Sequence, residues 1–207
     1  MKVCGLTGGV GMGKSTAAGF LLAQGVRVVD TDDLARELVQ PGQPALAEIS
    51  NQFGKGIILA SGELNRAKLA RIVFADPVAR RQLESILHPR IRTSWLAQIE
   101  IWRQENVPLA FVVIPLLFET QAENNFAKII CVACSPASQR ERLAARGWSP
   151  DQIRQRIAAQ MPVEQKLHRS HFVVWSEGLP GVHRRQIIEI IDKIMLILFV
   201  TICNHNW

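Results

Sequence analysis

The stretch Gly8-Gly9-Val10-Gly11-Met12-Gly13-Lys14-Ser15 decides the fold of this chain. It fits the pattern G-x-x-x-x-G-K-[ST], in which the glycines let backbone N–H groups turn inward around phosphate oxygens. Lys14 can reach the β- and γ-phosphates of a nucleotide, and the Ser15 hydroxyl can coordinate Mg²⁺. We therefore predict a loop that binds nucleotide phosphates, with Ser15 as its metal ligand and these binding residues: Gly9, Gly11, Met12, Gly13, Lys14, Ser15 and Thr16.

The sequence on both sides of this loop has the pattern that the motif requires. The short apolar run Lys2–Thr7 suits a buried parallel strand, and Ser15–Gln24 suits a helix that Gly25 ends. The helix N-terminus adds its positive dipole end to a phosphate site. A chance glycine-rich turn would lack this order of strand, loop and helix, and a G-x-G-x-x-G dinucleotide site would lack the Lys-Ser ending.

Length and composition limit the class of protein. The chain has 207 residues, 48% of them hydrophobic, which is enough for one α/β domain with a small insertion. The net charge of +6 suits an anionic ligand and equally suits an ordinary surface. A nucleic-acid partner is not expected, because the chain has no Tyr and its basic residues are spread along the sequence.

The cysteines and the N-terminus favour a cytoplasmic protein. Cys131 and Cys134 have C-x-x-C spacing, but they lie in the apolar run Lys128–Cys134, where buried cysteines are a better interpretation than a redox pair. We expect no signal peptide, since the sequence enters a predicted strand at once.

Predicted strands and helices alternate along the chain. The strands are Lys2–Thr7, Val26–Asp30, Leu109–Ile114, Lys128–Cys134 and His171–Trp175. The helices after the first are Asp33–Val39, Ala45–Phe53, Asn65–Phe74, Asp76 to about Asn106 with a bend near His88-Pro89, Ser135–Arg146, Ser149 to about Met161, and Gly181 or Val182 to Val200. This alternation predicts a parallel sheet covered by helices on both faces, with ligands bound beyond the carboxyl ends of the strands.

An apolar segment, Ile194–Cys203, ends the last predicted helix. Asp192-Lys193 interrupt the apolar run on its N-terminal side, so it falls short of the roughly 20 residues that a membrane span needs. We expect the segment to pack on the domain or on a partner subunit, without stable membrane insertion. Peripheral membrane contact is the weaker alternative, and the tail after Cys203 has no functional interpretation.

An acidic pair, Asp30-Thr31-Asp32, follows the second predicted strand. Phosphoryl transfer to a hydroxyl needs a carboxylate that accepts the hydroxyl proton. Two residues apart on an extended segment, Asp30 and Asp32 share a face, so one can take the proton while the other organises metal-bound water. The alternative is that Asp32 only caps the helix Asp33–Val39.

Arginines flank the Gly-Trp-Ser-Pro break at residues 147–150. Arg142 and Arg146 are four residues apart and face the same way on one predicted helix, and Arg154 and Arg156 lie on the next. This placement favours a lid that closes over a triphosphate and stabilises the charge in transfer. The alternative is a pair of solvated helix faces.

A second basic group lies in the long helical tract. The cations of His88–Arg92, with Arg66, Lys68 and Arg71, can hold an acidic acceptor substrate, although a charged helix surface has the same composition. The chain has no N-K-x-D segment of the kind that reads guanine. ATP is therefore the expected phosphate donor.

Together, these motifs resemble those of the dephospho-CoA kinase family. The matching segments are Leu6–Thr16, Val29–Arg36, Pro41–Leu46, His88–Arg92, Pro115–Glu119 and Gln139–Arg146, with Gln160 downstream. The glycine loop alone is shared by many nucleotide-binding proteins. The series D-x-D-x-x-A-R, PG-x-PAL, HP-x-I-R and PLLFE in this order is specific, and the resemblance covers residues 3 to about 178.

The resemblance implies a reaction and a set of residues. The reaction is ATP-dependent phosphorylation of the ribose 3′-hydroxyl of dephospho-CoA, with Asp32 as general base, Lys14 and Ser15 on phosphate and Mg²⁺, and Arg142 and Arg146 acting from a lid at about 139–161. The implied substrate-binding residues are Asp32, Arg36, His88, Arg92, Leu117 and Glu119. The implied fold is one P-loop NTPase domain, residues 1–207, with three α/β/α layers, a five-stranded parallel sheet and a helical CoA-binding insertion at about 62–106. We expect a monomer or a weak homo-oligomer.

Two segments depart from the family pattern. Ser170–Ser176 replaces A-D-x-V-I-x-N near the last strand, so the usual Asp and Asn are absent beside the expected adenine pocket. The apolar C-terminus replaces a polar one. Two other functions stay open: another small-molecule kinase on the same scaffold, which would lack the HP-x-I-R and PLLFE series, and a nucleotide-binding protein without catalytic activity.

Overall fold

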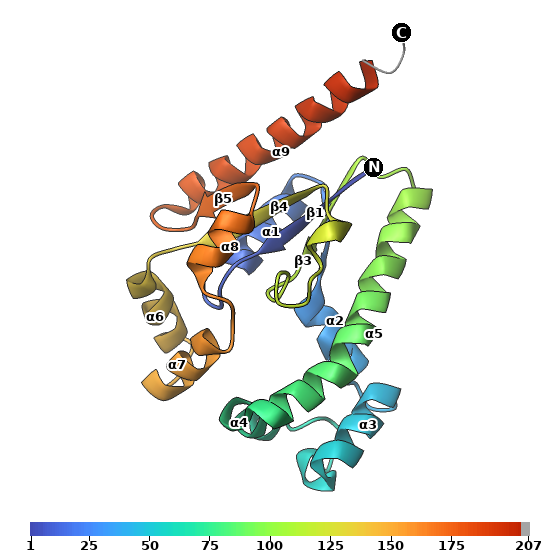
Figure 1. Ribbon diagram of the computed structural model, residues 1–207, viewed down its shortest axis with the longest axis vertical. Helices are drawn as coiled ribbons and strands as arrows, with labels where there is room; N and C mark the ends of the chain where they lie inside the picture. The colour runs from blue at the N-terminus through green and yellow to red at the C-terminus, as the bar shows by residue number, and fades with distance from the viewer. Residues whose placement is uncertain (204–207) are drawn as a thin grey trace.

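The computed structural model describes residues 1–203 and centres on a five-stranded parallel sheet (Figure 1). Its strands, in the spatial order β2-β3-β1-β4-β5, are β1 (Lys2–Thr7), β2 (Arg27–Asp30), β3 (Leu109–Val113), β4 (Lys128–Ala133) and β5 (Phe172–Trp175). All neighbouring strands run parallel, with Lys2 opposite Leu109 and Ala133 opposite Trp175. The five predicted strands are confirmed, each with bounds within one residue of those expected.

Helices connect and cover these strands. In residues 1–203 they are α1 (Lys14–Ala23), α2 (Thr31–Leu38), α3 (Pro44–Phe53), α4 (Arg66–Ala75), α5 (Pro77–Gln104), α6 (Pro136–Ala144), α7 (Pro150–Ala158), α8 (Val163–Arg169) and α9 (Pro180–Cys203), with 3₁₀ turns at Lys55–Ile57 and Glu123–Asn125. A capping box begins α7 at Ser149, whose side chain accepts from the backbone N–H of Gln152 while the Gln152 side chain accepts from the backbone N–H of Ser149. The short helix α8 is the one that the sequence did not predict.

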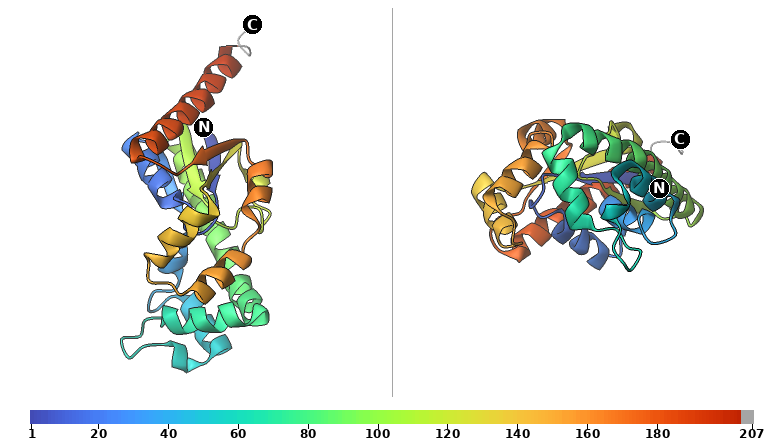
Figure 2. Two further views of the ribbon diagram at one scale, coloured as in Figure 1. Left: turned by 90° about the vertical axis from the view of Figure 1, so that its left-hand side faces the viewer. Right: turned by 90° about the horizontal axis from the view of Figure 1, so that it is seen from below.

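The helices form layers on both sides of the sheet (Figure 2). On one face, Leu21 of α1 and Ile187 of α9 share a buried cluster with Phe111 of β3. On the other face, Trp95 and Trp102 of α5 pack over the central strands. The inner strands β1, β3 and β4 are almost wholly buried, because a parallel sheet with both faces covered leaves its central strands without solvent contact. The predicted three-layer architecture is confirmed.

A helical unit extends away from the sheet, at the bottom of Figure 1. α3, α4 and the first half of α5 surround a separate hydrophobic cluster, which includes Val39, Ile49 and Leu69. α5 continues through Pro89 as one helix, and its second half packs on the sheet. The predicted insertion at 62–106 therefore packs together with residues that begin at Val39. Its role in binding CoA stays a prediction.

The last helix, α9, packs on the domain through its first part; of the apolar segment Ile194–Cys203, Ile194 and Met195 make the expected contacts, and the side chains of residues 197–203 lie outside the described part of the structure. Ile187, Ile190 and Ile194 are buried in the cluster beside β5 and α1, whereas Leu196 is 66% exposed. Within residues 1–203, none of the helices combines the length and apolar character needed to cross a membrane. The tail after Cys203 lies outside the described residues.

Candidate active site

The glycine loop joins β1 to α1 at the carboxyl edge of the sheet. Gly8 has φ of 144° and Gly13 has φ of 94°, backbone conformations that other residues rarely adopt. A Cβ at Gly8 would also lie 2.2 Å from the carbonyl oxygen of Val132. α1 begins at Lys14, so its N-terminal N–H groups face the same space as the loop. This is the geometry that the motif predicts for a phosphate cradle.

Lys14 is folded back onto the loop. Its Nζ donates to the carbonyl oxygens of Gly8 and Gly9, at 3.0 and 2.9 Å. Burial lowers the pKa of Lys14 to about 8, and the Asp32 carboxylate opposes this shift. A buried ammonium held by carbonyl dipoles is well suited to take an anionic phosphate oxygen as a stronger partner.

Two cavities meet beyond the strand ends. The loop cavity has a volume of about 400 Å³, and its walls include Gly11, Gly13, Lys14, Ser15, Thr16, Asp30, Arg80, Arg146, Arg156 and Gln160. The helix cavity has a volume of about 440 Å³, and its walls include Thr31, Ala35, His88, Pro89, Ile91, Arg92, Trp95 and Thr120. Asp32, Pro115 and Leu116 line both cavities. A group held in the helix cavity can therefore face a phosphate held by the loop across Asp32.

The two aspartates do not share an extended segment, so that part of the sequence prediction is wrong. Asp30 ends β2 and caps α2, and its side chain accepts a hydrogen bond from the backbone N–H of Asp32 at 2.9 Å. Asp32 lies in the first helical turn, and its exposed side chain lines both cavities. Burial raises the pKa of Asp30. The capping task therefore falls to Asp30 and leaves the Asp32 carboxylate available at the junction.

The arginines predicted for a lid occupy different positions. Arg146 lines the loop cavity. Arg142 binds Ser176, with its guanidinium 2.8 Å from the hydroxyl oxygen and 2.6 Å from the carbonyl oxygen. Arg154 pairs with Asp151 on the exposed side of α7. Of the predicted catalytic pair, Arg146 therefore lines the loop cavity. Arg142 does not, because its side chain is bound to Ser176 directly after β5.

Arg156 joins the segment predicted to be a lid to the helical unit. Its guanidinium carbon lies 4.0 Å from the centre of the Trp148 ring and 4.3 Å from the centre of the Phe74 ring. Trp148 precedes α7 and Phe74 belongs to α4, so the cation is stacked between two parts of the chain. α7 and α4 are consequently in direct contact beside the loop cavity.

The segment that departs from the family pattern contacts the glycine loop. The Ser176 hydroxyl donates to the carbonyl oxygen of Met12 at 2.8 Å while it accepts from Arg142. A Cβ at Gly13 would lie 3.1 Å from this hydroxyl, which shows how closely the loop and the end of β5 approach. Through these two hydrogen bonds, Ser176 links the glycine loop to Arg142 of α6 at the expected adenine end of the site.

The predicted acceptor residues separate into two groups. His88 and Arg92 line the helix cavity, and burial lowers the pKa of His88. Arg36 instead pairs with Asp33 at 2.6 Å on the exposed side of α2. Leu117 is fully buried in the core, where its Cδ1 would lie 2.6 Å from a Cβ at Gly5.

Glu119 also faces the protein and lines neither cavity. Its Oε1 accepts from the backbone N–H of Met161 and pairs with Lys166, both at 2.8 Å. Its neighbours Pro115 and Leu116 form the cavity walls instead, whereas Leu117 is buried in the core and Glu119 faces Lys166. The prediction of Glu119 as a direct ligand contact has no support in this geometry.

Three residues of the site were not identified from their side-chain chemistry. Gln139 donates to the carbonyl oxygen of Val10 at 2.8 Å, and Gln160 accepts from the N–H of Val10 at 2.9 Å, so both hold the tip of the loop. Lys166 is completely buried. Both glutamines lie in segments that match the family's series of motifs, although the sequence did not indicate their contacts with the loop. Lys166 lies in α8, the helix that the sequence did not predict.

The loop cavity offers oxygen donors that suit Mg²⁺. Ser15, Asp30 and Asp32 all contribute to its wall. In residues 1–203, no three side chains of His, Cys, Asp or Glu form a group that could hold a metal ion. Mg²⁺ typically uses one or two protein ligands together with phosphate oxygens and water. The residues present therefore fit a metal that binds together with the nucleotide.

Glu177 anchors α6 to the end of β5. Its Oε1 accepts from the backbone N–H of Ser135 at 3.0 Å and from the hydroxyls of Ser135 and Ser138, and its Oε2 accepts from the indole N–H of Trp175 at 2.9 Å. The hydrogen bonds from Ser135 and Ser138 are the main reason that the pKa of Glu177 is lowered to about 2.

Glu177→Gln should lower the melting temperature at pH 7. A carboxylate whose pKa is depressed by folding stabilises the protein above its ordinary pKa of 4.5, and this contribution disappears as the pH falls toward 2. The difference in melting temperature between the wild type and the variant should therefore shrink between pH 5 and pH 3, measured by calorimetry. Glu141→Gln, on the exposed face of α6, is the control. A constant difference over this range would contradict the assignment.

Comparison with known proteins gives a consistent result. The sequence profile described as dephospho-CoA kinase (CoaE) matches residues 2–179. The dephospho-CoA kinase of Anaeromyxobacter dehalogenans is 45% identical over 181 residues, which cover 87% of this chain and 86% of the relative. A crystal structure from Thermus thermophilus superimposes with a TM-score of 0.74 at 33% identity and covers 93% of this chain and 97% of its own. The dephospho-CoA kinase structure from Campylobacter jejuni has a TM-score of 0.68 at 26% identity, with 93% of this chain and 96% of its own covered.

These matches include β1, the glycine loop, both cavities and the segment that ends β5. They cover more than two thirds of each relative, and the profile reaches from the first strand to the residues after Ser176. The two departures from the family pattern thus leave the assignment intact. The chain belongs to the dephospho-CoA kinase family and has the α/β fold of P-loop kinases.

Proposed function

We propose that this protein transfers the γ-phosphoryl group of ATP to the ribose 3′-hydroxyl of dephospho-CoA, which gives CoA and ADP. The observation that carries the proposal is the position of Asp32, which lines both the loop cavity and the helix cavity. The first cavity has the elements of a phosphate-donor site, and the second can hold an alcohol against it. The carboxylate between them is where a proton acceptor for that alcohol is needed.

The donor occupies the loop cavity. Backbone N–H groups of the loop and the N-terminus of α1 bind the β- and γ-phosphates. Lys14 exchanges the carbonyl oxygens of Gly8 and Gly9 for phosphate oxygens, and Arg146 and Arg156, which line the same cavity, neutralise further charge. Mg²⁺, held by Ser15 and the nucleotide, supplies further charge neutralisation when it is bound.

The acceptor occupies the helix cavity. Ile91 and Trp95 give this cavity apolar walls, and His88 and Arg92 place polar groups on the same side of α5. This combination suits a substrate with both apolar and phosphate-bearing parts. The ribose must lie at the end where Asp32, Pro115 and Leu116 line both cavities, since only there can its hydroxyl reach the donor phosphate.

The transfer is an in-line displacement. The 3′-oxygen forms a bond to the γ-phosphorus, and its proton passes to the Asp32 carboxylate. The bond from the γ-phosphorus to the bridging oxygen breaks, and ADP leaves with the electron pair. Positioning and charge neutralisation provide most of the rate acceleration, because the transition state needs little covalent assistance from the protein.

A coupled assay of ADP release tests the proposal. With Mg²⁺ and ATP present, dephospho-CoA should be turned over, and the product should carry its new phosphate at the ribose 3′ position, as shown by ³¹P NMR. Turnover of nucleoside monophosphates in place of dephospho-CoA would favour another small-molecule kinase. Binding of ATP without turnover of either acceptor would favour a non-catalytic nucleotide-binding protein.

A further inference from the structure

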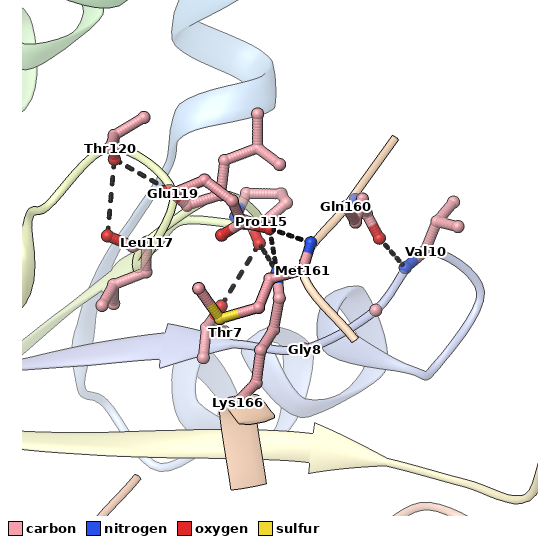
Figure 3. Close-up of polar contacts among 12 residues, drawn as sticks. Thr7, Gly8, Val10, Pro115, Leu117, Glu119, Thr120, Gln160, Met161 and Lys166 are labelled. Atoms are coloured by element: carbon pink, nitrogen blue, oxygen red, sulfur yellow. Dashed lines mark hydrogen bonds and ion pairs between the residues drawn. The ribbon is translucent and has the colours of Figure 1, made fainter. Parts of the chain in front are cut away.

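Lys166 of α8 carries a charge in the interior of the molecule. Its side chain has no exposed surface, and its Nζ donates to the carbonyl oxygen of Pro115 at 2.7 Å and pairs with Glu119 at 2.8 Å (Figure 3). Burial of a charged pair is rarely the most stable choice, since apolar residues of similar volume often serve stability as well or better. The contacts that Lys166 makes therefore point to a task other than stability.

The first contact fixes the wall between the two cavities. The Pro115 carbonyl accepts from Lys166 and also from the hydroxyl of Thr7 at 3.3 Å. Thr7 is the last residue of β1 and directly precedes the glycine loop, while Pro115 and Leu116 line both cavities. Lys166 thus sets the position of the wall relative to the loop.

The second contact reaches the tip of the glycine loop. Glu119 Oε1, which pairs with Lys166, also accepts from the N–H of Met161. The preceding residue, Gln160, accepts from the N–H of Val10. The other carboxylate oxygen of Glu119 is buried and has no hydrogen-bond partner among the described residues. The orientation of Glu119, and with it the Gln160–Met161 segment, therefore depends on the Oε1 contacts, of which Lys166 provides the charged one.

We propose that Lys166 is a positioning residue for phosphoryl transfer. It holds the shared cavity wall and the segment that returns from the lid in one arrangement around the glycine loop. It lines neither cavity, so it acts through Pro115 and Glu119 rather than on the substrates. This inference rests on the proposed function, because the distance that Lys166 controls is the one between the donor phosphate and the acceptor hydroxyl.

Lys166→Met tests this role, because it removes the charge and keeps most of the length of the side chain. We expect kcat with dephospho-CoA to fall by about 10- to 100-fold, the effect of misplacing reacting groups without removing them. The dissociation constant of ADP should change by less than about 3-fold, since the loop N–H groups and Lys14 remain. Arg103→Met is the control: Arg103 pairs with Glu100 on α5 away from both cavities, and its side chain is 61% exposed. It should retain wild-type kinetics.

Loss of stability must be separated from loss of position. The double variant Glu119→Gln/Lys166→Met removes the unpaired buried carboxylate that the single variant leaves, so it should recover melting temperature. It should not recover kcat, because neither variant restores the contact to Pro115. If kcat returns with the melting temperature, or if Lys166→Met retains wild-type kcat, Lys166 is merely structural and the proposal is wrong.

Hydrogen exchange of the ligand-free protein provides a test that needs no turnover. In Lys166→Met the N–H groups of Val10 and Met161 should exchange faster, while those of β1 and β4 keep their protection. Unchanged exchange at Val10 and Met161 would overturn the proposal even in an active enzyme. If the wild type fails to phosphorylate dephospho-CoA, the proposed function fails, and the exchange data still decide whether Lys166 holds these segments together.

Discussion

Asp32→Asn should lower kcat by about 10²- to 10⁴-fold, the usual contribution of a general base, while the affinity for ATP stays near that of the wild type. The amide has nearly the same shape as the carboxylate but cannot accept the proton of the 3′-hydroxyl. Asn is also tolerated in the first turn of α2, where Asp32 lies. Single-turnover kinetics and calorimetric titration with a non-hydrolysable ATP analogue measure the two quantities separately.

Two neighbouring aspartates make this experiment decisive. Asp33→Asn changes an exposed residue that pairs with Arg36 and lines neither cavity, so it should leave kcat unchanged. Asp30→Asn keeps the helix cap, because Asn caps helices about as well as Asp. If Asp30→Asn abolishes turnover while Asp32→Asn does not, the proton acceptor is Asp30 and the assignment of Asp32 is wrong.

Lys14→Ala should lower kcat/KM for ATP by about 10³-fold or more, through both binding and turnover. The ammonium is the cation closest to the loop carbonyls of Gly8 and Gly9, where the phosphates are expected. Its loss removes charge that balances the β- and γ-phosphates in the bound state and in the transition state. Calorimetric titration with ADP and steady-state kinetics give the two parts of the effect.

The stability of the same variant provides the control. Burial depresses the pKa of Lys14 to about 8, which means that the folded protein holds the ammonium at a cost. Ala also suits the first position of α1. The melting temperature of Lys14→Ala should consequently equal or exceed that of the wild type. A marked decrease would show that lost activity reflects unfolding, and the exposed Lys55→Ala should alter neither property.

Features that depend on neighbours in the sequence were predictable. The glycine loop, the strand before it and the helix after it follow from local pattern, and so do the five apolar strands. The capping box at Ser149 is likewise a local signal. In each case, the residues that determine the structure lie within a few positions of one another.

Features that depend on where the chain turns were harder to predict from the sequence. The D-x-D spacing is the same whether the segment is extended or crosses from strand to helix, and only the cap at Asp30 decides between these arrangements. In the same way, the PLLFE segment identifies the turn after β3 but does not indicate that Leu117 faces the core and Leu116 the cavities. Lys166 and Glu119 are far apart in the sequence, and only the tertiary fold brings them together.

The path of α5 has a consequence for how the two substrates influence each other. Its first half packs in the helical unit and its second half packs on the sheet. His88, Pro89, Ile91 and Arg92 lie between these halves and line the helix cavity. The same helical unit carries Phe74, on which Arg156 stacks beside the loop cavity. Ligands in the two cavities would therefore contact the same helical unit, and we expect their binding free energies to be linked. Whatever factor the acceptor contributes to the affinity for ATP, ATP must contribute to the affinity for the acceptor.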